Sequence, residues 1–266
     1  MERFYVAPED IGADTARITG DELKHLKNVL RLKAGDPVEV FDGAGGGYVG
    51  RLTSVDQHRA LAELREPVTE ARDSALRICL AQGMPKGEKM DFIVQKNTEL
   101  GVKSIMPLEL SRCVVRLEGE KKRRDRQARW QKVAREAARQ CGRLSIPEIL
   151  PPGDLETFLR QITPDDLLLI PWEEGGMELK PFFAEAQGRD AELKRRRGRV
   201  LIMIGPEGGM TMDEVVAGRL AGGQVLTLGP RLLRTETAGM ALLSILQYHW
   251  GDLGERPLID RQRNEE

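Results

Sequence analysis

Cysteine and histidine are scarce in this sequence, and the few present are poorly placed for cross-linking or metal binding. Its 266 residues include 3 Cys and 3 His. Cys79, Cys113 and Cys141 lie far apart and form no C-x-x-C pair. Disulfide frameworks and structural zinc sites depend on paired thiols or on clustered Cys and His. We therefore expect reduced thiols, no metal site and a cytoplasmic protein.

Long apolar runs are absent as well. Hydrophobic residues make up 40% of the chain, but no run approaches the roughly 18 residues that cross a bilayer. The first ten residues, MERFYVAPED, lack the apolar segment of a secretory signal. We therefore expect neither a membrane segment nor secretion. The length allows one large domain or two smaller ones, each with its own core.

An overall charge of one sign is also missing, because the formal net charge is −1. The charge is uneven, however. Residues 121–143 contain ten Lys or Arg against only Asp125 and Glu136, a local charge of +8. A basic face of this kind can neutralise phosphates and attract a polyanion. The alternative is a solvated helix face, and the charge pattern alone does not separate the two.

The first 66 residues are rich in β-strand patterns. Three stretches alternate apolar and polar residues between Gly or Asp, as in a small barrel: 36–43, 47–55 and 58–66. The Gly-rich residues 43–47 lie between two of these strands and predict a hairpin turn. A helix is predicted over 23–32, behind a capping box of Thr19 and Glu22. Polar residues 66–74 contain Pro67 and indicate a linker.

Strands and helices alternate after this linker. Buried-strand patterns occur at 76–82, 102–110, 166–174, 199–205 and 223–229. Helical spacing occurs at 86–101, in the basic stretch and at 238–250, whereas the charged residues 192–199 suggest a surface loop. This alternation predicts an α/β domain with a mostly parallel sheet.

Two of these strands end at a Gly-Pro corner, IGPEGG (204–209) and LGPRLL (228–233). Ligands of open α/β sheets bind where the carboxyl ends of strands lead into helices. Neither corner fits G-x-G-x-x-G or a Gly-Lys-Ser/Thr phosphate loop, so a pyrophosphate cofactor is poorly supported. Thr211 and Glu214 predict a capping box for the helix after the first corner.

The second corner is followed by an unusual concentration of polar side chains. Arg231, Arg234, Thr235, Glu236 and Thr237 lie within seven residues. Such groups are costly to bury unless they are paired or face a ligand. The alternative is that one threonine only caps the following helix.

Six motifs then carry a resemblance that runs in order from the N-terminus to about residue 250. The chain resembles the small-subunit (16S) ribosomal RNA uridine N3-methyltransferases, a family of the SPOUT superfamily. The motifs are HLKNVLR (25–31), QKNTELGV (95–102), SRCVVR (111–116), RWQKVAREAARQCGR (129–143), IGPEGG (204–209) and LGPRLLRTETA (228–238).

This resemblance implies two domains and a cofactor. Residues 1–70 would form a PUA-like RNA-binding β-barrel, and residues 71–266 a SPOUT methyltransferase domain with a C-terminal trefoil knot. The protein would be a homodimer that uses S-adenosyl-L-methionine to methylate N3 of a uridine in 16S rRNA or the small ribosomal subunit. Two alternatives are another SPOUT enzyme that acts on transfer RNA or ribose, and a non-enzymatic RNA-binding assembly protein.

The resemblance also assigns the cofactor to three loops. Each is expected to contribute backbone and apolar contacts to the bent ligand. The implied cofactor-binding residues are Leu169, Pro171 and Glu173 in the first loop, Ile204, Gly205 and Gly209 in the second, and Leu226, Leu228, Gly229, Leu232, Leu233 and Thr235 in the third.

Methyl transfer to N3 needs a group that weakens the N3–H bond and a cation for the charge that develops on the uracil oxygens. Glu207 and Glu236 are the candidate carboxylates, and Arg231 and Arg234 the candidate cations. The alternatives are that Glu236 pairs with Arg234 as a structural ion pair, and that Glu207 caps a helix. A metal is not required, because the leaving group is already activated.

Several basic residues are candidates for RNA binding. Lys27 lies beside the candidates near the N-terminus, and for His25 and Lys27 the alternative is that they belong to an ordinary helix surface. For Lys96 the alternative is an ion pair with Glu99 or Glu109. The candidates are Arg3, His25 and Arg31 near the N-terminus, Lys96 and Arg112 beside the sheet, and Arg123 and Arg124 in the basic stretch.

Overall fold

The computed structural model describes residues 1–70, 72–196 and 198–254, which form two compact units. The first unit contains Met1–Asp73 and Arg135–Ile146. The second contains Ser74–Ala134 and the described residues from Pro147 onward. The helix of the basic stretch therefore contributes to both units, which the sequence analysis did not anticipate. Within the described residues no helix is long and apolar enough to cross a membrane.

A five-stranded sheet forms the first unit, in the order β1-β3-β4-β5-β2. Irregularities in the β4–β5 pairing, at Val49/Gly50 and Leu52/Ser54, let it curl around a buried apolar cluster. The predicted turn at 43–47 joins β3 to its antiparallel neighbour β4. The sequence analysis missed two of the five strands, β1 and β2. The bounds are β1 Glu2–Tyr5, β2 Thr15–Ile18, β3 Pro37–Phe41, β4 Gly47–Val55 and β5 Ala60–Pro67, with a short 3-10 helix η1 at Pro8–Asp10.

The predicted helix near residue 25 exists, but its expected capping box does not form. Helix α1 (Gly20–Lys24) continues as the π-helical turn η2 (His25–Leu30), and the Thr19 side chain makes no cap hydrogen bond. The half-buried Glu22 carboxyl lies near Glu136 and Arg139, and burial, followed by the Glu136 charge, raises the pKa of Glu22 to about 7. Glu22 therefore interacts with the end of another helix, not with the amide of Thr19.

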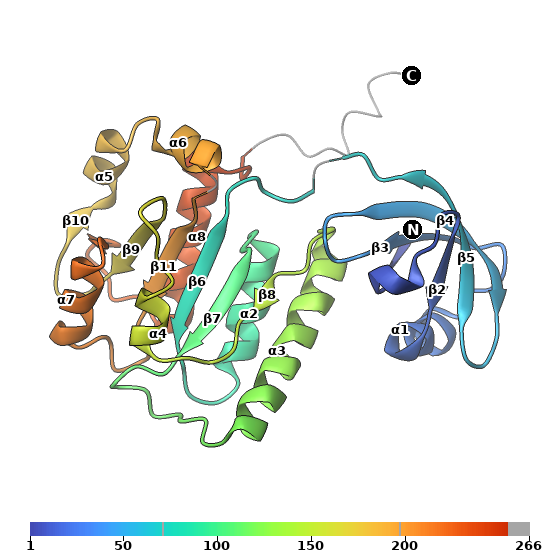
Figure 1. Cartoon of the computed structure of the whole chain (residues 1–266), viewed down its shortest axis with the longest axis horizontal. Coiled ribbons are helices and arrows are strands. Elements are labelled where there is room, and N and C mark those ends of the chain that lie inside the picture. Colours follow the sequence, from blue (N-terminus) through green and yellow to red (C-terminus); the bar gives the residue numbers. More distant parts are fainter. Residues whose placement is uncertain (71, 197, 255–266) are drawn as a thin grey trace. The chain divides into compact units, whose positions relative to one another are not determined.

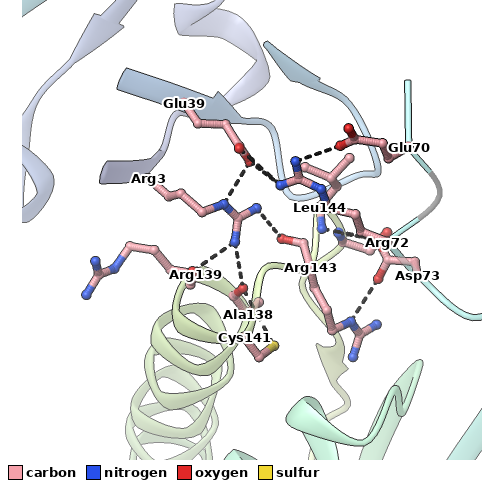
Figure 2. Close-up of polar contacts among 11 residues, drawn as sticks. Arg3, Glu39, Glu70, Arg72, Asp73, Ala138, Arg139, Cys141, Arg143 and Leu144 are labelled. Atoms are coloured by element: carbon pink, nitrogen blue, oxygen red, sulfur yellow. Dashed lines mark hydrogen bonds and ion pairs between the residues drawn. The ribbon is translucent and has the colours of Figure 1, made fainter. Parts of the chain in front are cut away.

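A buried carboxylate ties the C-terminal end of α3 (Glu120–Cys141) into the first unit (Figure 2). Glu39 accepts from Arg3 at 2.7 Å and from Arg72 at 2.8 and 3.0 Å. The Arg3 guanidinium also donates to the carbonyls of Ala138, Arg139 and Arg143 at 3.3, 2.8 and 2.9 Å. The last carbonyls of a helix have no partner inside it, so Arg3 satisfies groups that would otherwise need water. This network explains why residues 135–146 belong to the first unit.

The second unit is built on a seven-stranded sheet in which every pair is parallel, as predicted (Figure 1). The strand order is β10-β12-β9-β11-β6-β7-β8. The strands are β6 Ile78–Gly83, β7 Ser104–Leu108, β8 Glu148–Ile149, β9 Leu167–Pro171, β10 Met177–Glu178, β11 Val200–Ile204 and β12 Gln224–Thr227.

Helices cover both faces of this sheet. Gly218 of α7 lies against Met203, whereas Gly239 of α8 lies against Leu80, the neighbour of Ile202 in the sheet. Consecutive residues of a strand point to opposite faces, so α7 and α8 cover opposite sides. Helix α2 packs beside α8. The helices of this unit besides α3 are α2 Lys89–Glu99, α4 Leu155–Leu159, α5 Leu179–Glu185, α6 Arg189–Arg196, α7 Met212–Leu220 and α8 Thr235–Trp250.

Two details of this unit bear on the predictions. Residues 192–196 belong to helix α6 and not to a loop, because Glu, Leu, Lys and Arg all favour helix; residue 197 lies outside the described residues. The chain also leaves the sheet at β12 and returns in α8 to pack on β6 and β11. The predicted knot would need such a return past β9 and β11, and the knot itself stays a prediction.

Candidate active site

Three loops meet at the carboxyl ends of β9, β11 and β12 and enclose a cavity of about 410 Å³. Its walls combine apolar side chains, exposed glycine backbone and four charged residues. Helix α2 contributes one wall residue, Lys89, that the sequence analysis did not single out. The lining residues are Lys89, Pro171, Glu173, Ile204, Gly205, Pro206, Glu207, Gly209, Leu232, Leu233, Arg234, Thr235 and Ala238.

A second cavity of about 210 Å³ adjoins the first and shares five of its lining residues. It lies between the loops that follow β9 and β12. Trp172, Leu228, Gly229 and Arg231 are among the residues found only in this part. Ten of the twelve residues predicted to bind the cofactor therefore line one or both cavities.

The remaining two, Leu169 and Leu226, lie inside β9 and β12 with no exposed surface. Their side chains pack in the sheet and do not face either cavity. The backbone carbonyl of Leu226 accepts from the amide of Trp172 at 2.9 Å, which joins the first loop to the third.

The loop after β11 bends closely under the cavity. A Cβ on Gly205 would lie 3.0 Å from backbone atoms of Gly209 and Met210. Gly209 has a positive φ of 71°, which other residues adopt only with strain. The Thr235 hydroxyl donates to the carbonyl of Gly205 at 2.6 Å and accepts from Gln82 at 2.8 Å. Thr235 thus fixes this loop and does not cap α8, whose N-cap residue is Arg234.

Two further contacts hold the same loop from outside. Arg112 donates to the carbonyls of Gly208 and Met210 at 2.9 and 3.3 Å. The predicted capping box of Thr211 and Glu214 is present. Burial would raise the pKa of Glu214, but hydrogen bonds from the Ser111 and Thr211 amides lower it. Arg112, predicted to contact RNA, therefore supports the loop.

The charged side of the cavity centres on Lys89. Its ammonium lies 3.0 Å from Glu207 Oε1 and 3.4 Å from Glu236 Oε2. The amide of Lys86 donates to the Glu207 carboxylate at 3.1 Å. Burial opposes the ionisation of Glu207, but hydrogen bonds from the backbone and Lys89 lower its pKa. The same Glu207 contact raises the pKa of Lys89.

The suggested ion pair between Glu236 and Arg234 does not form. Among the described residues, the carboxylate of Glu236 pairs with Lys89, and neither Arg231 nor Arg234 makes an ion pair. Both arginines are exposed at the cavities that they line. The described residues also contain no group of three His, Cys, Asp or Glu that could hold a metal.

The residues predicted to bind RNA are in different situations. Arg3 is held by Glu39, Lys96 by Glu99 at 2.9 Å, and Arg123 by Glu109 at 2.9 Å. The ammonium of Lys27 donates to the carbonyl of Asp56 and His25 is half-buried, whereas Arg31 and Arg124 are exposed. For Lys96, the structure shows the ion pair with Glu99 that the sequence analysis had given as the alternative to RNA binding.

Comparison with known proteins places these features in a family. Residues 72–247 match the family of RNA methyltransferase domains, and residues 18–65 match the RNA methyltransferase PUA domain. The ribosomal RNA small subunit methyltransferase E of Bacillus subtilis is 34% identical, over 93% of this chain and 96% of its own.

Two solved structures are similar over almost the whole chain. A ribosomal RNA small subunit methyltransferase E from Neisseria gonorrhoeae, bound to S-adenosyl methionine, has a TM-score of 0.82 and 37% identity, covering 95% of this chain and 99% of that one. A putative methyltransferase from Legionella pneumophila, in complex with the same molecule, has a TM-score of 0.82 and 31% identity, covering 94% and 98%. With its parallel sheet, its curled N-terminal sheet and these matches, the chain belongs to the RNA methyltransferase family.

Proposed function

We propose that this protein transfers the methyl group of S-adenosylmethionine to N3 of a uridine in 16S ribosomal RNA. The observation that carries the proposal is the paired cavity at the ends of β9, β11 and β12, lined by ten of the twelve predicted cofactor residues. Its volume, about 410 Å³ with a further 210 Å³ beside it, falls in the range of small-molecule sites. The likeness to two relatives solved with this molecule supports the same reading.

The residues present fit this cofactor. The apolar side chains of Pro171, Ile204, Leu232 and Leu233 offer a surface for a flat adenine ring. Gly205 and Gly209 line the cavity without side chains, so a ligand can approach their backbone closely. Glu173, at the shared wall of both cavities, gives a negative environment that favours a sulfonium over a neutral product.

When bound, S-adenosylmethionine supplies an activated methyl group, which N3 takes while the carbon–sulfur electron pair stays on sulfur. The chain has to remove the N3 proton and hold N3 in line with the methyl carbon and the sulfur. Glu236, which pairs with Lys89, is our candidate for the proton acceptor, because several donors hold Glu207 and lower its pKa. Arg234 and Arg231, exposed at the cavity mouth, are the candidates for stabilising charge on the uracil oxygens.

The RNA would be bound by the PUA domain and by the first turns of α3. Lys121, Lys122 and Arg124 are exposed there. Positive charges at a helix N-terminus oppose the helix dipole and lower helix stability. A cost of this kind is expected where the charges serve a polyanionic partner, and this supports RNA binding by α3.

The test combines product mapping with single-turnover kinetics. Mass mapping of 16S rRNA after reaction should place one added methyl group on a uracil base. Arg234→Ala and Glu236→Gln should each slow methyl transfer by about a hundredfold or more, with cofactor affinity by calorimetry near that of the wild type. A cofactor affinity that collapses in step with the rate would argue against the catalytic roles, and a ribose or transfer RNA product would overturn the proposed reaction.

We also propose a cytoplasmic homodimer. Leu242 and Leu246 of α8 are fully buried within the described chain. Ile245 instead lines an apolar groove with Phe183 and His249, whose rings stack at 4.1 Å. This groove is a surface that a second copy could cover. Sedimentation at micromolar concentration should give the mass of two chains, and a single-chain mass would contradict the proposal.

A further inference from the structure

One lysine stands between the two carboxylates of the candidate active site. Lys89 begins helix α2, and its ammonium reaches Glu207 Oε1 at 3.0 Å and Glu236 Oε2 at 3.4 Å. The three residues come from different parts of unit 2, since Lys89 and Glu207 are separated by 118 positions. Lys89 also lines the larger cavity together with Glu207 and Arg234.

The two carboxylates depend on Lys89 to different degrees. Glu207 also accepts from the Lys86 amide. Glu236 has a side chain only 15% exposed, and its Oε2 is buried without a hydrogen bond of good geometry from any described residue. Among the described residues, Lys89 is thus the one cation paired with Glu236. A partly buried carboxylate without such a partner would favour its neutral form.

The other charged groups near Glu236 are few. Glu207, from the loop after β11, shares the Lys89 ammonium with it, and Arg234 precedes it at the start of α8. Glu173, from the loop after β9, lines the larger cavity, whereas Glu236 lies behind the wall that Lys89 and Glu207 form and is not among its lining residues. Gln82 of β6 lies next to the first turn of α8 through Thr235 but carries no charge. Glu207 is therefore the negative group that shares an ion-pair partner with Glu236, and Lys89 offsets both charges.

We propose that Lys89, which lines the larger cavity, is a positioning residue that keeps Glu236 ionised and fixed beside the cavity wall, ready to accept the N3 proton of the uridine. The inference rests on the proposed function. In this step the N3–H bond breaks, the proton moves to a carboxylate oxygen of Glu236, and the electron pair stays on N3 for the new bond to the methyl carbon.

The proposal predicts opposite shifts for two substitutions. Lys89→Met removes the cation and leaves Glu236 beside Glu207, so Glu236 takes up a proton at higher pH. The acid limb of the pH profile, where the single-turnover rate falls on acidification, therefore moves to higher pH by about one unit or more. Glu207→Gln removes the like charge and leaves Lys89 to Glu236 alone, so the acid limb moves down. Lys89→Arg keeps the charge and should retain most of the wild-type profile.

The experiment compares these variants with Lys103→Met, which removes an exposed lysine of the same unit. Each is measured for single-turnover methylation against pH and for the titration of the Glu236 carboxyl by ¹³C NMR without cofactor or RNA. We expect Lys103→Met to match the wild type. An acid limb and a carboxyl titration that stay in place in Lys89→Met would overturn the inference, even if stability or cofactor affinity fell.

The outcome is separable from that of the proposed function. If the wild-type protein places no methyl group on uracil N3, the proposed function fails, whereas the carboxyl titration still reports on the pairing of Lys89 with Glu236. If the wild-type protein methylates N3 and Lys89→Met keeps the wild-type pH profile, only the role of Lys89 is wrong.

Discussion

Replacing Arg3 by methionine separates a structural role from RNA binding at one residue. The sequence favours an RNA contact, whereas the structure uses the guanidinium inside the first unit (Figure 2). Its side chain is only 12% exposed. We therefore expect Arg3→Met to destabilise this unit, with little direct effect on RNA affinity when the unit is folded.

The size of the effect follows from the contacts. The substitution removes the 2.7 Å bond to Glu39 and the bonds to three carbonyls near the end of α3. Breaking a buried ion pair costs roughly 3–5 kcal/mol, mainly because one charge is left alone. Arg72 remains on Glu39 at 2.8 and 3.0 Å, so the cost should lie near the low end, about 3 kcal/mol.

Hydrogen exchange followed by mass spectrometry is the assay, because it reports on each unit separately. Amides of β1 and of residues 135–141 should exchange about a hundredfold faster in Arg3→Met. The matched control is Arg17→Met, whose ion pair with Asp10 is exposed and should contribute less than about 1 kcal/mol. Wild-type protection in Arg3→Met together with weakened RNA binding would refute the structural role.

Three further predictions concern the second unit. Gly209→Ala forces alanine into a positive φ against Glu173, so calorimetry should show about tenfold weaker cofactor binding. An unchanged affinity would contradict a role of the Gly205–Gly209 backbone in binding the cofactor. Arg124→Ala should reduce the slope of log RNA affinity against log salt concentration by about one. An unchanged slope would mean that Arg124 makes no phosphate contact and is only solvated. Burial would raise the pKa of Asp166, but hydrogen bonds from Arg199 and the backbone lower it from 3.8 to about 2. The ionised Asp166 therefore stabilises the fold above about pH 4, and this stabilisation is lost as pH falls toward 2. The free energies of urea unfolding of Asp166→Asn and of the wild type should converge in acid.

Several elements could be read from the sequence because their signals are local. The apolar runs at 76–82 and 199–205 form β6 and β11, and the predicted capping box of Thr211 and Glu214 is present. A strand, a helix start or a tight turn depends on neighbours within a few residues. The corners at Gly205 and Gly229 marked the cavity for the same reason, since they end strands whose carboxyl ends lie on one edge of a parallel sheet.

The pairing of charges was decided by the tertiary structure. The sequence analysis did not single out Lys89 and named Arg3 as a candidate for RNA binding, because nothing within ten residues of either indicated its partner. The strand order brings β11 beside β6, and so places the start of α2 against the loop that carries Glu207. Charges attract across any sequence separation, and only the fold determines which of them lie within a few ångströms of one another.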